Sequence, residues 1–247
     1  MAGNFLIYPE IFGGETGKIR AFFTGIVPGA DRSAICRLLG ISDQALIMPI
    51  QRHTSDILAY SGKETETPAC ADAVITILDG VALGVKTADC VPVLLADEKT
   101  GAIGAVHAGW RGTAAAILPA AIAKMTALYG CRPEDMKLAI GPSIRGCCYE
   151  VGADVSGQVR AGVGGSADYF RMDENGLFPV HLDLAAANRS SALRAGVRAE
   201  NIWVSEMCTC CHPERFNSYR RETRAGKVHS ATAGGRQGGF IMKVSQG

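Results

Sequence analysis

The stretch from residue 81 to residue 112 reads VALGVKTADCVPVLLADEKTGAIGAVHAGWRG and decides the fold class. It contains three apolar runs, Val81–Val85, Val91–Ala96 and Ile103–His107, which are separated by polar residues and glycines. Short apolar runs that are bounded by turn residues predict buried β-strands. The stretch therefore predicts three successive strands with polar residues at their ends.

An alanine-rich segment, Thr113–Leu128, follows these strands and predicts a long helix. Its apolar residues cover almost the whole circumference, which indicates a buried helix. Pro119 lies inside the segment and is expected to kink or break the helix, because proline lacks an amide N–H and its ring clashes with the preceding turn. Gly130 is placed to end the helix in the left-handed conformation.

Turn residues and caps define the elements on either side. Asp79-Gly80 predicts a hairpin between a strand at Ala71–Ile77 and the strand Val81–Val85. Asp183–Ala195 predicts a second helix, which Asp183 caps and Gly196 closes.

The rest of the chain completes a mixed pattern. Gly157–Asp168 is rich in glycine and is expected to be a surface loop. Further strands are predicted at Ile19–Thr24, Leu46–Gln51, Lys137–Ile140, Ile202–Ser205 and Phe240–Val244. Because hairpins and crossovers are mixed, we expect residues 1–247 to form a single α/β domain, a layered sandwich with mixed sheets.

The composition excludes several classes of protein. The chain has 25 Lys and Arg against 24 Asp and Glu, a formal net charge of +1, which argues against nucleic-acid binding and a polybasic membrane-surface role. No secretory signal and no apolar run long enough to span a bilayer is visible in the sequence. The nine cysteines are an odd number, so they cannot all pair, and we expect free thiols in a reducing cytoplasm.

Three segments place polar residues at the ends of apolar strands, where α/β proteins usually carry their sites. They are Gln51–His53, Thr87–Cys90 and His107–Gly112. Together, His53, Cys90 and His107 supply two imidazoles and one thiolate, the ligand set of catalytic zinc sites that keep one position open.

Each of these three residues also has an ordinary structural interpretation. A strand-end histidine is often satisfied by a backbone carbonyl, and a cysteine between apolar residues is usually a small buried hydrophobic side chain. The intervals of 36 residues from His53 to Cys90 and 16 from Cys90 to His107 are not a zinc signature by themselves.

Two further cysteine clusters are Cys147-Cys148 and Cys208-Thr209-Cys210-Cys211-His212. Neither contains the paired C-x-x-C motifs of structural zinc sites, and adjacent side chains such as Cys210 and Cys211 rarely point to one ion. We interpret both clusters as thiols near or lining a pocket, and a second metal stays an alternative.

Arginines form the third group of candidates. Arg111 lies in a glycine-framed turn before the predicted helix, where a guanidinium and free amide N–H groups suit a phosphate or carboxylate. Arg145 and Arg220 are further candidates for substrate contact, with Arg221 beside the latter. The glycine-rich segment around Arg236 matches no phosphate-binding loop.

The chain resembles the laccase-domain family, once called polyphenol oxidases and later described as multifunctional purine nucleoside enzymes. The resemblance runs from about Leu46 to the C-terminus and is carried by Thr87-Ala88-Asp89-Cys90, followed by His107-Ala108-Gly109-Trp110-Arg111-Gly112. Further matching segments are Gln51–His53, Ala71–Ala73, Ile140–Ile144, Cys147–Gly152, Cys208-Thr209 and Ser218–Arg221.

The resemblance implies a zinc site at His53, Cys90 and His107, with copper as the alternative metal. It implies phosphorolysis of adenosine, inosine, guanosine and methylthioadenosine to the base and ribose-1-phosphate or methylthioribose-1-phosphate, and hydrolytic deamination of adenosine. Purine nucleosides and phosphate are then the partners, with Cys90, His107 and Arg111 as catalytic residues. The implied fold is similar to the cysteine-hydrolase-like toxin fold.

Two segments depart from the family pattern. The family usually reads Gln-Val-His-Gly around the first ligand, whereas this chain has Gln51-Arg52-His53-Thr54. The family's Gly-Gly-Val-Ser stretch is replaced by TGIVPGADRSA at Thr24–Ala34. We expect Arg52 and Thr54 to alter the rim of the pocket, and we carry over no substrate contact from the family to Thr24–Ala34.

Other functions stay open at the level of sequence. In a peptidoglycan precursor-editing amidase, Cys90 would be the nucleophile and His107 its base. A copper-dependent polyphenol oxidase is the family's older assignment, but the chain has five histidines, too few for a multicopper centre. A non-catalytic binding module would keep its function after Cys90→Ala.

Overall fold

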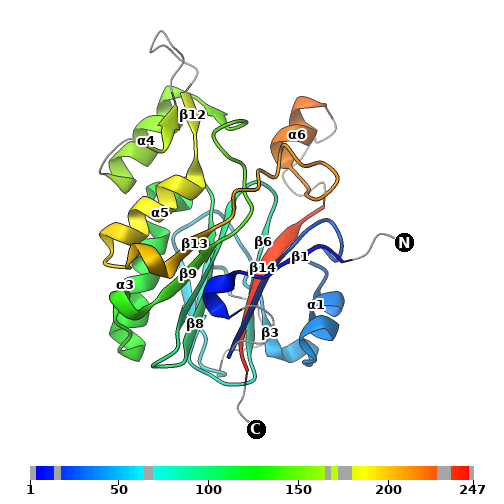
Figure 1. The fold of residues 1–247 in the computed structure, drawn as a ribbon, viewed down its shortest axis with the longest axis vertical. Helices are drawn as coiled ribbons and strands as arrows, with labels where there is room; N and C mark the ends of the chain where they lie inside the picture. The colour runs from blue at the N-terminus through cyan, green and yellow to red at the C-terminus, as the bar shows by residue number, and fades with distance from the viewer. Residues whose placement is uncertain are drawn as a thin grey trace.

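The computed structural model describes residues 4–13, 18–63, 69–164, 168–171, 180–226 and 235–244. Within these ranges the strands form sheets of six, five and three strands. The two large sheets run along the long axis of the molecule, with helices on both outer sides (Figure 1). The expected α/β class with layered, mixed sheets is confirmed.

The six-stranded sheet is built around two strands of the 81–112 stretch. β7 (Val91–Asp97) and β8 (Ala102–Ala108) pair antiparallel at its centre. The strand order is β13-β9-β7-β8-β5-β4, and the β13–β9 and β4–β5 pairs at the two edges are parallel. The flanking strands are β4 (Ile57–Ala59), β5 (Ala73–Thr76), β9 (Lys137–Ile140) and β13 (Ile202–Val204).

The five-stranded sheet has the order β1-β2-β14-β6-β3. Its long central strand, β14 (Gln237–Lys243), joins the C-terminal segment to both halves of the sheet. The other strands are β1 (Leu6–Ile7), β2 (Ile19–Thr24), β3 (Leu46–Ile47) and β6 (Ala82–Thr87).

Alternation along β7 shows how the layers pack. Leu94 and Ala96 face the five-stranded sheet and share a core with residues of β2, β6 and β14. Val93 and Leu95 face the other way and pack with the helices. The six-stranded sheet is therefore buried on both faces, which explains its nearly continuous apolar strands.

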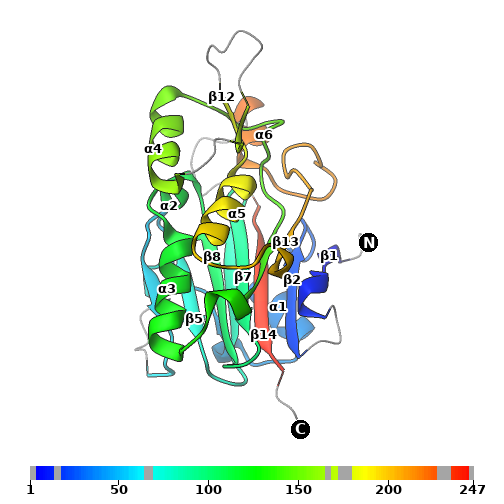
Figure 2. The ribbon, with the colours of Figure 1, turned by 60° about the vertical axis from the view of Figure 1, so that its left-hand side comes forward.

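Helices cover the outer faces of both large sheets. α3 (Ile117–Tyr129) and α5 (Leu184–Arg194) lie on the six-stranded sheet (Figure 2), and α1 (Arg32–Leu39) packs on the five-stranded sheet. The result is a four-layer α/β/β/α arrangement. Short 3-10 turns lie at Glu10–Phe12, Asp43–Ala45, Pro133–Asp135 and Ala199–Asn201.

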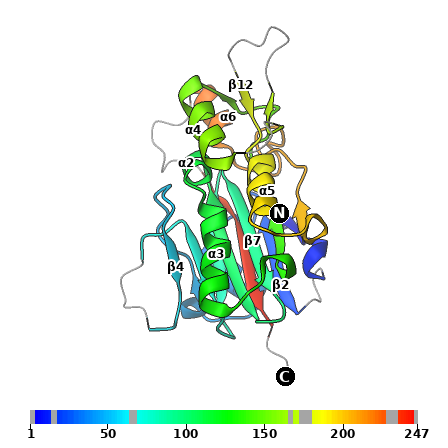
Figure 3. The same ribbon diagram turned by 90° about the vertical axis from the view of Figure 1, so that its left-hand side faces the viewer.

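Smaller elements gather at one end of the molecule, beyond the end of β8 (Figure 3). They are α2 (Trp110–Ala114), α4 (Ala153–Val163), α6 (Tyr219–Arg224) and the sheet of β10 (Glu150–Val151), β12 (Val180–Leu182) and β11 (Phe170–Arg171).

The long helix predicted at Thr113–Leu128 is two helices. α2 ends at Ala114 and α3 begins at Ile117, with Ala116 between them at φ 55° in the left-handed region. Pro119 therefore lies in the first turn of α3, where its missing N–H breaks no helical hydrogen bond. Gly130 ends α3 in the left-handed conformation, as predicted.

Two other local predictions are wrong. The strands on either side of Asp79-Gly80 form no hairpin, because β5 pairs with β4 and β8 while β6 pairs with β3 and β14 in the other sheet. Most of the loop expected at Gly157–Asp168 is helical, since α4 continues to Val163, and residues 165–167 lie outside the described ranges.

Other predictions are confirmed or stay open. Asp183 caps α5 by accepting a hydrogen bond from the Ala186 amide, as predicted. No helix of the described residues is long and apolar enough to cross a membrane. The likeness to the toxin fold, the extent of one domain over residues 1–247 and the cytoplasmic location stay predictions.

Candidate active site

The three segments singled out in the sequence meet at the end of the two large sheets. His107 lies in β8, Cys90 in the turn between β6 and β7, and His53 in the loop between β3 and β4. One side-chain nitrogen or sulfur of each residue lies within 4.8 Å of the others, and Cys90 Sγ is 3.9 Å from His53 Nε2. His107 is buried and His53 is exposed, so the cluster opens to solvent on the His53 side.

The topology explains why residues so far apart in sequence converge. The segment carrying His53 leaves β3 in the five-stranded sheet and enters β4 in the six-stranded sheet. The turn carrying Cys90 crosses between the same sheets, from β6 to β7. Both connections lie at the end of the sandwich where β8 ends at His107 and Ala108. The cluster therefore lies where the chain passes between the two sheets.

Asp72 orients the buried histidine. Its carboxylate is fully buried and lies 2.8 Å from Nδ1 of His107. A carboxylate only accepts hydrogen bonds, so Nδ1 carries the proton and Nε2 keeps a lone pair for a metal or a proton. Histidines that bind a metal through one ring nitrogen commonly donate the N–H of the other to a carboxylate in this way.

The same carboxylate holds the loop that carries His53. Asp72 accepts hydrogen bonds from the amides of Arg52, His53 and Thr54 and from the Thr54 hydroxyl, at 2.7 to 3.0 Å. These contacts stabilise His53 at φ 59°, a left-handed conformation that non-glycine residues rarely adopt. Although burial favours the neutral acid, the hydrogen bonds from His107, Thr54 and Arg52 hold the pKa of Asp72 well below its usual range.

Asp89, the residue before Cys90, holds the turn that carries Cys90, as Asp72 holds the loop that carries His53. It has φ 90°, and its carboxylate accepts hydrogen bonds from the Thr209 hydroxyl, the Ser218 hydroxyl and the Arg220 amide, at 2.6 to 3.0 Å. Backbone strain of this kind persists only where surrounding contacts enforce it, and it is frequent at functional sites. These contacts with Thr209, Ser218 and Arg220 hold the turn that presents Cys90.

Cys90 and His107 stabilise each other's charged forms. Burial disfavours both charges, but the attraction between thiolate and imidazolium outweighs it, with Asp72 supporting His107 and with His53 supporting Cys90. The pKa of Cys90 falls to about 6 and that of His107 rises to about 9. Without a bound metal ion, the Cys90–His107 pair is therefore a thiolate beside an imidazolium at neutral pH.

Gly109 allows this close approach. A Cβ atom at this position would lie 3.0 Å from Cys90 Sγ and 3.2 Å from His53 Cδ2. Its φ of −72° suits any residue, so the requirement for glycine here is one of space.

The three arginines named from sequence lie in different surroundings. The Arg111 guanidinium stacks on the Trp110 ring at 4.3 Å, and that of Arg220 lies 5.0 Å from the Tyr149 ring. Arg145 instead donates to the Asp183 carboxylate and the Ser205 carbonyl. α2 has five residues, so the long-helix N-terminus expected beside Arg111 is absent from the described fold.

The surroundings of Tyr149 disfavour its ionisation. Burial raises the pKa of Tyr149, with further increases from the charges on Cys90 and Asp89, while those on Arg220 and Arg111 oppose the rise. Tyr149 therefore stays a neutral phenol, and the Arg220 guanidinium lies 5.0 Å from its ring.

The sequence interpretation missed Asp72, Asp89 and Tyr149 as parts of this site. Each lies within a segment that carried the family resemblance, but none was assigned a role. The available signal for Asp72 was a charged residue directly before an apolar strand, which burial makes costly unless it is paired.

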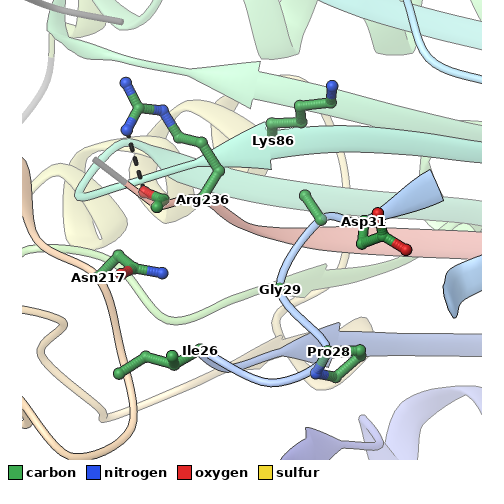
Figure 4. A pocket seen from close by; sticks show the side chains of 9 residues that line it. Ile26, Pro28, Gly29, Asp31, Lys86, Asn217 and Arg236 are labelled. Carbon is green, nitrogen blue, oxygen red and sulfur yellow. Dashed lines mark hydrogen bonds between the residues drawn. The ribbon is translucent and has the colours of Figure 1, made fainter. Parts of the chain in front are cut away.

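A hollow of about 380 Å³ lies at the side chain of Lys86 on β6. Lys86 and Arg236 line one side of it, and Ile26 and Pro28 line the other (Figure 4). None of its lining residues belongs to the cluster of His53, Cys90 and His107. The segment that departs from the family pattern, Thr24–Ala34, supplies five of them: Ile26, Pro28, Gly29, Ala30 and Asp31.

The fold and the cluster define a layered α/β protein with a candidate metal centre at one end of its sheets. The family model described as "multi-copper polyphenol oxidoreductase laccase" matches residues 29–242, and the chain belongs to this family.

Relatives and solved structures agree with this membership. A Deinococcus radiodurans protein named purine nucleoside phosphorylase is 45% identical over 151 residues, covering 61% of this chain and 56% of the relative. A protein named adenosine deaminase RL5, from an unknown prokaryotic organism, is 35% identical, covering 77% of this chain and 75% of the relative. The crystal structure of YlmD from Geobacillus stearothermophilus is 28% identical with a TM-score of 0.82, covering 95% of this chain and 94% of that one.

Proposed function

We propose that the protein is a zinc-dependent purine nucleoside enzyme. It phosphorolyses adenosine, inosine, guanosine and methylthioadenosine, and it deaminates adenosine by hydrolysis. The observation that carries the proposal is the convergence of His53, Cys90 and His107 at an open end of the sheets. The names of the D. radiodurans and RL5 relatives support purine nucleosides as the substrate class.

The residues of the cluster fit a zinc ion. Two imidazoles and one thiolate match zinc sites that leave a fourth position for water or substrate. Asp72 leaves Nε2 of His107 as the free donor atom, and Cys90 has a lowered pKa that favours the thiolate.

Too few of the described histidines lie at the cluster for a multicopper centre, which favours zinc. Of the other described histidines, His181 contacts the Gly146 carbonyl and His212 lies 3.5 Å from the Glu214 carboxylate. Neither belongs to the cluster of His53, Cys90 and His107. A single copper ion on the same three ligands stays the alternative metal.

The surrounding residues supply orientation and charge. When bound, zinc supplies a Lewis acid that lowers the pKa of a coordinated water to about 7. Asp72 fixes the tautomer of His107 and the position of His53. Arg111 and Arg220 provide positive charge near Tyr149, which suits phosphate beside the ribose of a bound nucleoside. Arg145 is already bound to Asp183, so we place phosphate on the other two arginines.

A panel of purine nucleosides, incubated with and without phosphate, tests this function. We expect free base whose release requires phosphate, and inosine from adenosine, both measured by chromatography. His53→Ala and Cys90→Ala should abolish both products, whereas Cys70→Ser, at an exposed cysteine outside the cluster, should retain them. No turnover of any purine nucleoside by folded, metal-loaded protein would contradict the proposal.

A second candidate function rests on the line of Cys90, His107 and Asp72. A thiolate beside an imidazolium that a carboxylate orients is also the arrangement of a cysteine nucleophile, as a peptidoglycan precursor-editing amidase would require. In that case Cys90 is free of metal in the active enzyme.

Alkylation with iodoacetamide separates the two functions. If Cys90 binds zinc, modification should be slow in the purified protein and fast after chelation. In the metal-free protein the rate should stay high down to about pH 6 and fall below it, since the thiolate is lost as pH drops through its pKa. Cys131, whose pKa burial raises to about 11, is the unreactive control. Fast alkylation of active, untreated protein would favour the amidase.

A further inference from the structure

A second group of sulfur atoms lies in the two cysteine clusters that the sequence left unresolved. Cys147, Cys148, Cys208 and Cys211 place their Sγ atoms within 4.8 Å of one another. Cys211 Sγ lies 3.5 Å from that of Cys147 and 3.3 Å from that of Cys148. The four cysteines come from two loops, one after β9 and one after β13. Cys147 and Cys148 are adjacent in sequence, but contrary to the expectation for neighbouring side chains both sulfurs lie close to that of Cys211.

The spacing of the sulfurs fits one tetrahedral ion. A Zn–S bond of about 2.3 Å sets neighbouring sulfurs of a tetrahedral site about 3.8 Å apart. The separations of Cys211 Sγ from Cys147 Sγ and Cys148 Sγ lie slightly below this value, and all pairs lie within 4.8 Å. Small side-chain rotations would therefore bring the thiols to coordination distance without backbone movement.

Backbone contacts hold the two loops together without help from the sulfurs. The Thr209 amide of the second loop donates to the Ser143 carbonyl of the first, and within the first loop the Cys148 amide donates to the Arg145 carbonyl. The Arg221 guanidinium binds the carbonyls of Thr209, Cys210 and Phe216. The positions of the four cysteines are thus set in advance of any ligand.

The surroundings of Cys208 hold its sulfur in place. Its side chain is buried, and the Arg145 amide donates to its sulfur at 3.4 Å. Cys147 and Cys211 are exposed, so an ion can enter from solvent. Soft thiolate ligands select zinc among the common divalent metals.

We propose that Cys147, Cys148, Cys208 and Cys211 bind one Zn²⁺ ion as a closed, structural site. Four protein ligands leave no position for substrate, unlike the cluster of His53, Cys90 and His107. The ion would join the loop that leads to Tyr149 to the loop whose Thr209 and Ser218 hydroxyls bind Asp89. It would stabilise the surroundings of Cys90 without contacting substrate.

Metal content of the full-length protein, purified under reducing conditions, tests the proposal. We expect inductively coupled plasma mass spectrometry to find one zinc equivalent that Cys90→Ser retains and Cys211→Ser loses. Cys70→Ser, the matched control at an exposed cysteine outside both clusters, should keep the wild-type content. If the first cluster also binds zinc, the wild type contains two equivalents and Cys90→Ser contains one.

Cobalt substitution identifies the ligands independently of the folding of Cys211→Ser. In the Cys90→Ser background, bound Co²⁺ should give the intense thiolate-to-metal absorption of a four-sulfur site. The proposal is overturned if Cys90→Ser contains no metal, or if Cys211→Ser keeps the full wild-type content. It is equally overturned if native protein purified under reducing conditions contains a Cys148–Cys211 disulfide in place of metal.

Discussion

Asp72 joins two of the proposed zinc ligands through one carboxylate. One oxygen contacts both the His53 amide and Nδ1 of His107, and the other contacts the amides of Arg52 and Thr54. A buried carboxylate with this many donors is stabilised in its charged form. The cluster therefore depends on a residue that itself provides no metal ligand.

Asp72→Asn is expected to weaken metal binding about 10- to 100-fold. An asparagine keeps one acceptor oxygen and turns an NH₂ group toward groups that are themselves donors. A competition titration with a chromophoric chelator measures the affinity. Asp97→Asn is the matched control, because Asp97 is also buried and accepts from the Lys99 and Thr100 amides away from the cluster. Equal zinc affinity in both variants would rule out the positioning role of Asp72.

Gly109→Ala tests the space beside Cys90. The added methyl group would press on Cys90 Sγ and His53 Cδ2 but suits the backbone, so we expect turnover to fall about tenfold or more with little change in thermal stability. Gly157→Ala is the control, since nothing lies within 4 Å of a Cβ there. Unchanged kcat/KM in Gly109→Ala would show that the cluster tolerates the displacement.

At the scale of elements, the short helix α2 depends on its packing against α4. A Cβ at Gly162 in α4 would lie 1.9 Å from the carbonyl oxygen of Ala114, the last residue of α2. The absence of a side chain at Gly162 thus lets α4 approach α2, which carries Arg111.

Gly162→Ala is expected to lower the free energy of unfolding by about 1–3 kcal/mol, because the two helices must separate. Gly157→Ala in the same helix should raise it by about 0.5–1 kcal/mol, since alanine loses less entropy in a helix and finds open space. Urea unfolding followed by circular dichroism gives both values. A Gly162→Ala protein as stable as the wild type would show that this contact can relax without cost.

At the scale of the whole molecule, the candidate site lies where both sheets end and several loops meet. The layers themselves are held by apolar cores between the sheets and under the helices. The side chains of the two proposed metal sites lie outside these cores. His107 lies near the end of β8, and the others lie in connections between secondary-structure elements.

Removal of metal should therefore lower stability without unfolding the layers. At a free metal concentration 1,000 times its dissociation constant, one site contributes about 4 kcal/mol, which corresponds to a melting temperature roughly 10 °C higher for a chain of this size. Calorimetry after chelation should show this fall, while far-ultraviolet circular dichroism at 20 °C stays unchanged. Loss of the secondary structure on chelation would place the metals within the folding core.

Much of the fold could be predicted because its signals are local. β2 and β9 have the predicted bounds, and β7 and β8 extend the predicted strands by one or two residues. Pairing could not be predicted in the same way. Asp79-Gly80 is a favourable sequence for a hairpin turn, but β5 and β6 pair with strands distant in the sequence and belong to two different sheets.

Residue patterns alone predicted the apolar strands of residues 81–112, with Cys90 and His107 at their ends, and His53 at the end of an earlier strand. Hydrophobic period, turn residues and ligand chemistry are properties of neighbouring residues, so they can be read in one dimension. Tertiary structure alone decided that Asp72 orients His107, and that Cys147 meets Cys211 from 64 residues away. Such contacts depend on how two sheets pack and where their connections cross, and no local pattern encodes that geometry.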